Sequence, residues 1–138
     1  MIKFGNVYFD KIDLEDSIIN SWSNENGVLK IEIEASLIKT HPKFQKPKKN
    51  ERSFYIEGTL IFNNVINISG MVPMEYVTPF GYADGTKDYD VIHCLWKIED
   101  GFYLEAEFGE VTIKCDMPIL ILKDDNEIVE SKILKFDE

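Results

Sequence analysis

The sequence has few of the residues that metal binding and catalysis use most often. Among 138 residues there are two cysteines, Cys94 and Cys115, and two histidines, His41 and His93. A zinc site normally needs three or four converging histidine, cysteine or carboxylate ligands. The sequence also lacks a Gly-x-Ser-x-Gly nucleophile turn and a glycine-rich phosphate-binding loop. These absences predict a non-catalytic protein without a metal or a cofactor.

Long apolar runs are also missing. No run approaches the roughly 20 residues that a membrane-spanning helix needs. The N-terminal segment MIKFGNVYFDK lacks the charged-then-apolar profile of a signal peptide. We interpret both cysteines as buried thiols, which suits a reducing compartment. We therefore expect a cytoplasmic protein that makes no contact with a membrane. No linker divides residues 1–138, so we expect a single domain.

Positive charge is scarce outside one segment. The chain has 15 basic and 25 acidic residues, a net charge of −10. Six of the basic residues lie within residues 39–52, which also contain two prolines and are expected to form a long exposed loop. The acidic remainder would repel phosphate backbones and attract basic partners. The charge balance thus argues against nucleic-acid binding and favours a basic protein partner, although it suits plain solubility equally well.

Period-two alternation is the strongest pattern in the chain, and it is clearest in residues 91–117. There it predicts a three-stranded antiparallel meander. A three-residue loop at 99–101 would set Trp96 opposite Leu104, and a two-residue loop at 109–110 would set Phe108 opposite Val111. In this register one face is wholly apolar and includes both cysteines, while His93 lies across from Glu107 on the other face.

Turn signals predict the remaining strands. Asn26-Gly27 is typical of a type I′ hairpin that sets Trp22 opposite Ile31 and Ile18 opposite Ala35. Further strands are expected at 3–9 (an edge strand), 53–62, 65–71, 118–123 and 128–136, with an acidic connector at 10–16. The loop that pairs 65–71 with 53–62 has two or three residues, and the tail also fits helical spacing. Gly58 would mark a bulge or a close backbone approach. Eight or nine strands predict an all-β protein, either an antiparallel β-sandwich or a partly open barrel.

Residues 72–89 are the most aromatic and least regular stretch. Aromatic side chains on a proline-stiffened loop can anchor a protein partner or stack on a sugar ring. Alternatively, they fold back over an open end of the core. The candidate binding residues here are Tyr76, Phe80, Tyr82, Asp84, Asp88 and Tyr89.

The sequence contains two weaker chemical signals. His93 near Glu107 and Glu105 resembles a carboxylate-oriented histidine, but such a pair is more often a surface contact between strands. Asp84, Asp88 and Asp90 approach the spacing of a calcium loop but lack its bidentate glutamate at the twelfth position. Neither signal predicts an ion site or a catalytic site.

Three segments resemble those of small bacterial β-rich proteins, including immunity proteins of polymorphic toxin systems. They are LEDSIINSW (14–22), LKIEIEASLI (29–38) and GTLIFNNV (58–65). The resemblance implies a non-catalytic cytoplasmic protein that blocks a toxin by binding it.

We therefore expect a protein-binding module of the immunity type. The alternative is a β domain that binds a small molecule or a carbohydrate in a pocket lined by Tyr76, Phe80 and Trp96. An enzyme centred on His93 and Glu107 is the least favoured hypothesis. An exposed edge strand would also permit a homodimer.

Overall fold

Antiparallel strands make up almost all of the regular structure. The computed structural model describes residues 1–136. Ten strands form one sheet: β1 (Lys3–Phe9), β2 (Ile12–Glu25), β3 (Val28–Leu37), β4 (Phe54–Phe62), β5 (Asn67–Ser69), β8 (Cys94–Ile98), β9 (Gly101–Ala106), β10 (Gly109–Lys114), β11 (Ile119–Leu122) and β12 (Glu127–Lys135). Two short strands, β6 (Phe80–Gly81) and β7 (Lys87–Asp88), pair separately, and η1 (Met74–Tyr76) is a single 3-10 turn. The all-β prediction is confirmed.

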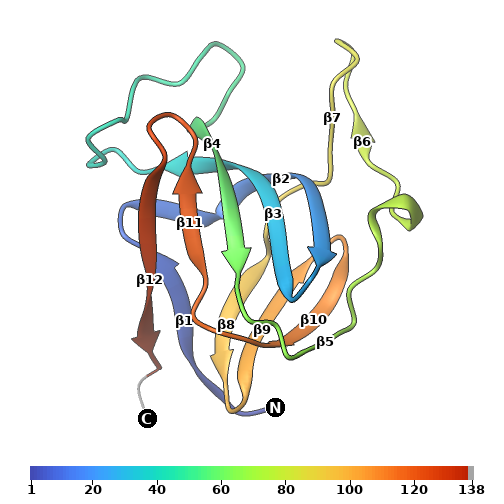
Figure 1. Cartoon of the computed structure of the whole chain (residues 1–138). Coiled ribbons are helices and arrows are strands. Elements are labelled where there is room, and N and C mark those ends of the chain that lie inside the picture. The colour runs from blue at the N-terminus through green and yellow to red at the C-terminus, as the bar shows by residue number, and fades with distance from the viewer. Residues whose placement is uncertain (137–138) are drawn as a thin grey trace.

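The large sheet curls into a partly open barrel (Figure 1). Its strand order is β2-β3-β4-β11-β12-β1-β8-β9-β10-β5. Of the two predicted architectures, the structure therefore has the barrel. No helix in residues 1–136 is long and apolar enough to cross a membrane, since η1 contains three residues.

Residues 89–92 close one side of the barrel against β2. The amide of Ile19 donates a hydrogen bond to the carbonyl of Asp90 at 2.8 Å, and the amide of Tyr89 donates to the carbonyl of Ile19 at 2.9 Å. The chain then runs directly into β8. This segment consequently covers part of the outer edge of β2.

The hairpin β2–β3 forms at Asn26-Gly27 as predicted. Both loop residues have positive φ, at 53° and 74°, and Trp22 pairs with Ile31. The inward residues of β3 are buried along its whole length: Leu29, Ile31, Ile33, Ala35 and Leu37. The predicted pairing of Ile18 with Ala35 is wrong, because the register shifts between Ile19 and Ser21 and brings Ile18 opposite Glu34.

The meander β8–β9–β10 is present, but its predicted register is wrong. Leu95, not Trp96, lies opposite Leu104, and Val111 also pairs with Leu104. Trp96 instead pairs with Tyr103 on the outer face, where the two rings stack at a centroid distance of 5.2 Å. The first predicted loop is one residue too long and the second is two residues too late, since the chain turns at 99–100 and at 107–108.

Two local features account for the register error. Gly101 belongs to β9 with φ at 139°, and a Cβ there would lie 2.0 Å from the carbonyl oxygen of Ile113. The glycine therefore permits the close approach of β10 and does not form the turn. In addition, β8 begins only at Cys94, after the segment 89–92 that pairs with β2. The residues that face inward therefore change from even numbers at Ile92 to odd numbers at Leu95.

The two cysteines differ in their surroundings. Cys94 is buried, but it shares the outer face with Trp96 because it pairs with Glu105. This corrects the prediction that it points inward. Cys115 is half-buried against the core, and both thiols are free. Burial raises the pKa of each thiol to about 11, so both are protonated at neutral pH.

Three further predictions about strand position are wrong. β1 lies between β12 and β8 and is not an edge strand. Residues 10–16 are not a connector, because the turn consists of residues 10–11 and β2 begins at Ile12. β5 pairs with β10 instead of with β4, so neither proposed hairpin loop exists.

Gly58 marks a close approach, since a Cβ there would lie 3.1 Å from the carbonyl oxygen of Ile121.

Candidate functional site

Residues 72–89, here called the aromatic arm, project from the barrel. They contain η1 and the small hairpin β6–β7, which stands away from the sheet at the upper right of Figure 1. The arm connects β5, at one end of the sheet, with the segment that closes the barrel against β2. Both ends of the arm are therefore attached to regular structure.

Hydrogen bonds and aromatic packing fasten the base of the arm. The indole Nε1 of Trp22 donates to the carbonyl of Val72 at 3.0 Å, and the amide of Val72 donates to the carbonyl of Phe108 at 2.8 Å. At the other end, the ring of Tyr89 meets that of Trp22 edge-on, with centroids 4.8 Å apart. One tryptophan thus contacts both ends of the arm.

The hairpin within the arm has its own polar contacts. The hydroxyl of Tyr82 donates to Asp88 at 2.7 Å, and this bond together with partial burial raises the pKa of Tyr82 to about 12. Asp88 is buried and also accepts from the amide of Asp90 at 3.0 Å. Asp84 accepts from both the amide and the hydroxyl of Thr86, which lowers the pKa of Asp84. These bonds hold the hairpin in one conformation.

Three aromatic residues of the arm are more than half exposed to solvent. The exposed fractions of Tyr76, Phe80 and Tyr82 are 77%, 52% and 53%. Tyr89 instead packs against the core. The expectation that the aromatics fold back over the barrel therefore holds for Tyr89 and fails for the other three. Of the six candidate residues, Tyr82 and Asp88 are in direct contact.

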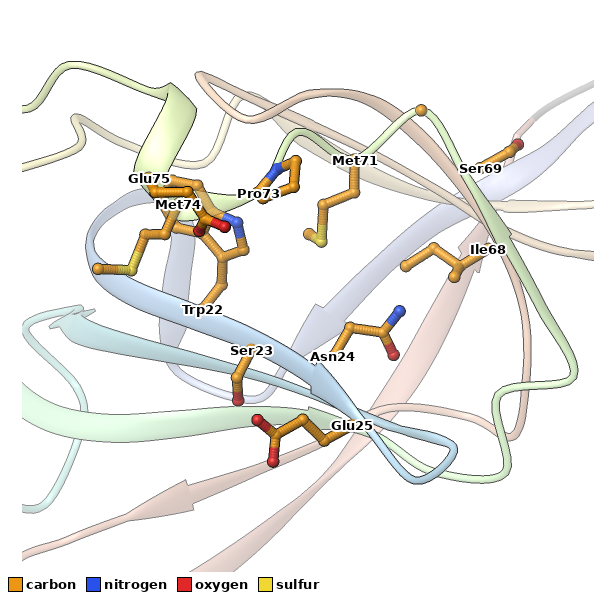
Figure 2. Close-up of a pocket in the computed structure, with 11 residues that line it drawn as sticks. Trp22, Ser23, Asn24, Glu25, Ile68, Ser69, Met71, Pro73, Met74 and Glu75 are labelled. Atoms are coloured by element: carbon orange, nitrogen blue, oxygen red, sulfur yellow. The ribbon is translucent and has the colours of Figure 1, made fainter.

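A groove of about 600 Å³ lies beside the base of the arm, between the end of β2 and the segment from β5 to η1. Figure 2 shows the side chains of Asn24, Ile68 and Met71 converging on this hollow. Trp22 and Met74 also line the groove, and Glu25 and Glu75 add negative charge to its lining. The sequence analysis missed this groove, because it paired Trp22 with Ile31 but did not predict that residues 68–75 lie beside the end of β2. The segment Met-Val-Pro-Met at 71–74 was the one sequence feature that could have indicated a groove lined by methionine.

The predicted pocket of Tyr76, Phe80 and Trp96 is absent from the described residues. Trp96 lies on the outer face of the meander, where the ammonium group of Lys3 sits 3.6 Å from its ring centroid. Tyr76 and Phe80 extend into solvent and do not line the groove.

His93 forms its ion pair with Glu105, although the sequence predicted Glu107 as its partner across the strands. The nearest ion pair of His93 is with Glu105, at 3.5 Å from Nδ1 to Oε2, and the His93 amide donates to the Glu105 carbonyl. The hydroxyl of Tyr103 donates to the same carboxylate at 2.6 Å. The side chains of His93 and Glu105 are 40% and 36% exposed.

The chain matches no protein family, no curated protein and no solved structure. Its fold and its surface are therefore the basis for the proposals below.

Proposed function

We propose that the protein is a non-catalytic binding module of the immunity type, which acts in the cytoplasm and neutralises a basic toxin by binding it. The aromatic arm is the main contact surface. Exposed aromatic side chains provide large contact areas at low entropic cost and are frequent among the residues that dominate binding energy.

The observation that carries the proposal is that the exposed aromatics stand on a fastened segment. Tyr76, Phe80 and Tyr82 point outward, while Trp22 holds both ends of the arm. A fastened loop loses little conformational entropy when it binds. This combination favours a preorganised protein interface over a loop whose only role is to connect strands.

Charge supports a basic partner. The arm and the residue after it contain three acidic residues that are not buried, Glu75, Asp84 and Asp90, against a single basic residue, Lys87. The adjacent groove adds Glu25. An acidic surface around aromatic anchors would steer a basic protein toward them.

Growth rescue tests the proposal. The proposal predicts that a toxin domain is encoded beside the gene, and co-expression of the wild-type chain with that domain should restore growth. The triple variant Tyr76→Ala/Phe80→Ala/Tyr82→Ala should fail to do so at equal expression. Tyr8→Ala is the matched control, because it removes an exposed aromatic from β1 and should rescue fully. Full rescue by the triple variant would refute the role of the arm.

A small-molecule site in the groove is the second candidate function. Its volume of about 600 Å³ falls within the range of ligand sites, and its apolar side is made by Trp22, Met71 and Met74. Methionine side chains adapt to ligands of different shape. A fragment screen observed by NMR should then shift Trp22 and Met71 signals together, and an absence of such shifts across the screen would remove this candidate.

A further inference from the structure

Three potential metal ligands meet where the aromatic arm returns to the barrel. One ligand atom from each of Asp90, His93 and Glu107 lies within 4.8 Å of the other two. These residues come from different parts of the fold: Asp90 and His93 from the crossover before β8, and Glu107 from the turn between β9 and β10. The sequence predicted that His93 and Glu107 lie close together, but it did not predict that Asp90 joins them.

Backbone contacts hold each of these residues in place. Asp90 has φ at 66°, its carbonyl accepts from Ile19 at 2.8 Å, and its amide donates to Asp88 at 3.0 Å. The amide of His93 donates to the carbonyl of Glu105 at 2.9 Å. Glu107 lies two residues beyond Glu105 and immediately after β9, in a tight turn closed by the pair Ala106 and Gly109. The site is thus assembled by the barrel itself.

A second carboxylate orients the histidine from outside the group. Glu105 lies 3.5 Å from Nδ1 of His93 and is itself held by the hydroxyl of Tyr103 at 2.6 Å. Metal-binding histidines commonly have one ring nitrogen on the ion and the other on such a carboxylate. The contact with Glu105 leaves Nε2 of His93 available to an ion.

The carboxylates in this region lack basic partners. In the part of the chain that the structure describes, neither Asp90 nor Glu107 forms an ion pair with a lysine or an arginine. Asp88 and Glu105 add further negative charge close by. A divalent cation would relieve this repulsion.

We propose that Asp90, His93 and Glu107 bind one divalent transition-metal ion, with Zn²⁺ as the best match. One imidazole and two carboxylates supply three ligands of the type that zinc accepts, and water completes the tetrahedron. The ion would join the segment that closes the barrel to the β9–β10 turn. It would therefore stabilise the base of the aromatic arm, independently of what the arm binds.

Calorimetric titration of the metal-free, full-length protein with ZnCl₂ tests the proposal. We expect one saturable site in the wild type and a loss of at least tenfold in affinity in His93→Ala. His41→Ala is the matched control, since it removes the one other histidine, and it should bind as the wild type does. The variant Cys94→Ser/Cys115→Ser should also retain the site, which excludes the thiols as ligands. Glu105→Gln should weaken binding by about tenfold, as for other carboxylates that orient a ligand.

Thermal unfolding provides a second readout and checks the folding of each variant. Zn²⁺ should raise the midpoint of the wild type and of His41→Ala, because an ion that binds only the folded chain stabilises it. His93→Ala should unfold at the wild-type metal-free temperature and show no shift. Absence of saturable Zn²⁺ binding, equal binding by His93→Ala, or loss of binding in His41→Ala would overturn the proposal.

Discussion

At the scale of single residues, Asp16 has the densest set of polar contacts in the described chain. Its carboxylate accepts from the hydroxyls of Ser36 and Ser53 at 3.0 and 2.5 Å and forms an ion pair with Arg52 at 2.6 Å. Arg52 and Ser53 lie at the end of the long loop whose residues 39–52 include six basic side chains. Asp16 therefore attaches that loop to β2 and β3, so the loop is more than a solvated connection.

Replacing Asp16 should destabilise the protein. Asp16→Ala leaves two hydroxyl groups without their acceptor, and we expect the free energy of unfolding to fall by about 1–3 kcal/mol. Urea denaturation measures this change. Asp84→Ala is the control, because Asp84 has contacts only within its own exposed turn and its loss should cost less than about 0.5 kcal/mol. Equal effects of the two substitutions would contradict the attachment role of Asp16.

The raised pKa of Glu34 predicts how the stability of the folded protein changes with pH. Burial, and to a lesser degree repulsion by Asp88, Glu51 and Glu57, raises the pKa of Glu34 above its ordinary value, although a bond from Asn20 opposes this. The folded state then binds the Glu34 proton more tightly than the unfolded state does. The ionised carboxylate therefore lowers stability at pH values above its folded pKa.

Glu34→Gln should consequently raise the free energy of unfolding at pH 7, by about 0.5 kcal/mol after allowance for solvent screening. The gain should shrink as the pH falls through the folded pKa and vanish below the unfolded value. Urea denaturation at a series of pH values measures it. A gain that stays constant down to pH 3 would show that packing, and not charge, is responsible.

At the scale of elements, the meander shows that alternation predicts which residues form strands but does not determine the register in which the strands pair. Alternation and turn residues correctly predicted three antiparallel strands in residues 91–117. They did not predict the register, because Gly101 was assigned to a turn when its role is to admit the carbonyl of Ile113. A glycine at a turn and a glycine at a close approach look identical in sequence.

Substitution of Gly101 tests this explanation. Gly101→Ala would place a Cβ 2.0 Å from the carbonyl oxygen of Ile113 at φ of 139°, and we expect a loss of at least about 2 kcal/mol in unfolding free energy. Gly81→Ala in β6 is the matched control, since its Cβ would meet nothing within 4 Å. Thermal or urea unfolding of both variants measures these losses. A Gly101→Ala protein as stable as the wild type would contradict the register described here.

At the scale of the whole molecule, local pairing was predictable only where strong turn signals and unbroken alternation agree, and long-range pairing was not predictable. The hairpin β2–β3 is encoded by Asn26-Gly27 and by faultless alternation in β3, so its register at Trp22 and Ile31 could be predicted. The pairing of β5 with β10 and the central position of β1 depend on contacts between distant segments, and no turn signal records them.

The same limit applies to the candidate site. The aromatic composition of residues 72–89 was evident from the sequence, but the contacts of Trp22 that fasten the arm were not. Trp22 lies 50 residues before the carbonyl of Val72, to which it donates. The groove also depends on contacts between distant segments, and the grouping of Asp90 with Glu107 depends on how the segment before β8 meets the β9–β10 turn.

The affinity of the protein for the toxin domain that the proposal predicts beside its gene tests the central claim most directly. Calorimetry should give a dissociation constant at least 100-fold weaker for Tyr76→Ala/Phe80→Ala/Tyr82→Ala than for the wild type, because central aromatic contacts each contribute about 1–4 kcal/mol. Tyr8→Ala should bind within twofold of the wild type. Undiminished affinity in the triple variant would show that the partner does not bind through the aromatic arm.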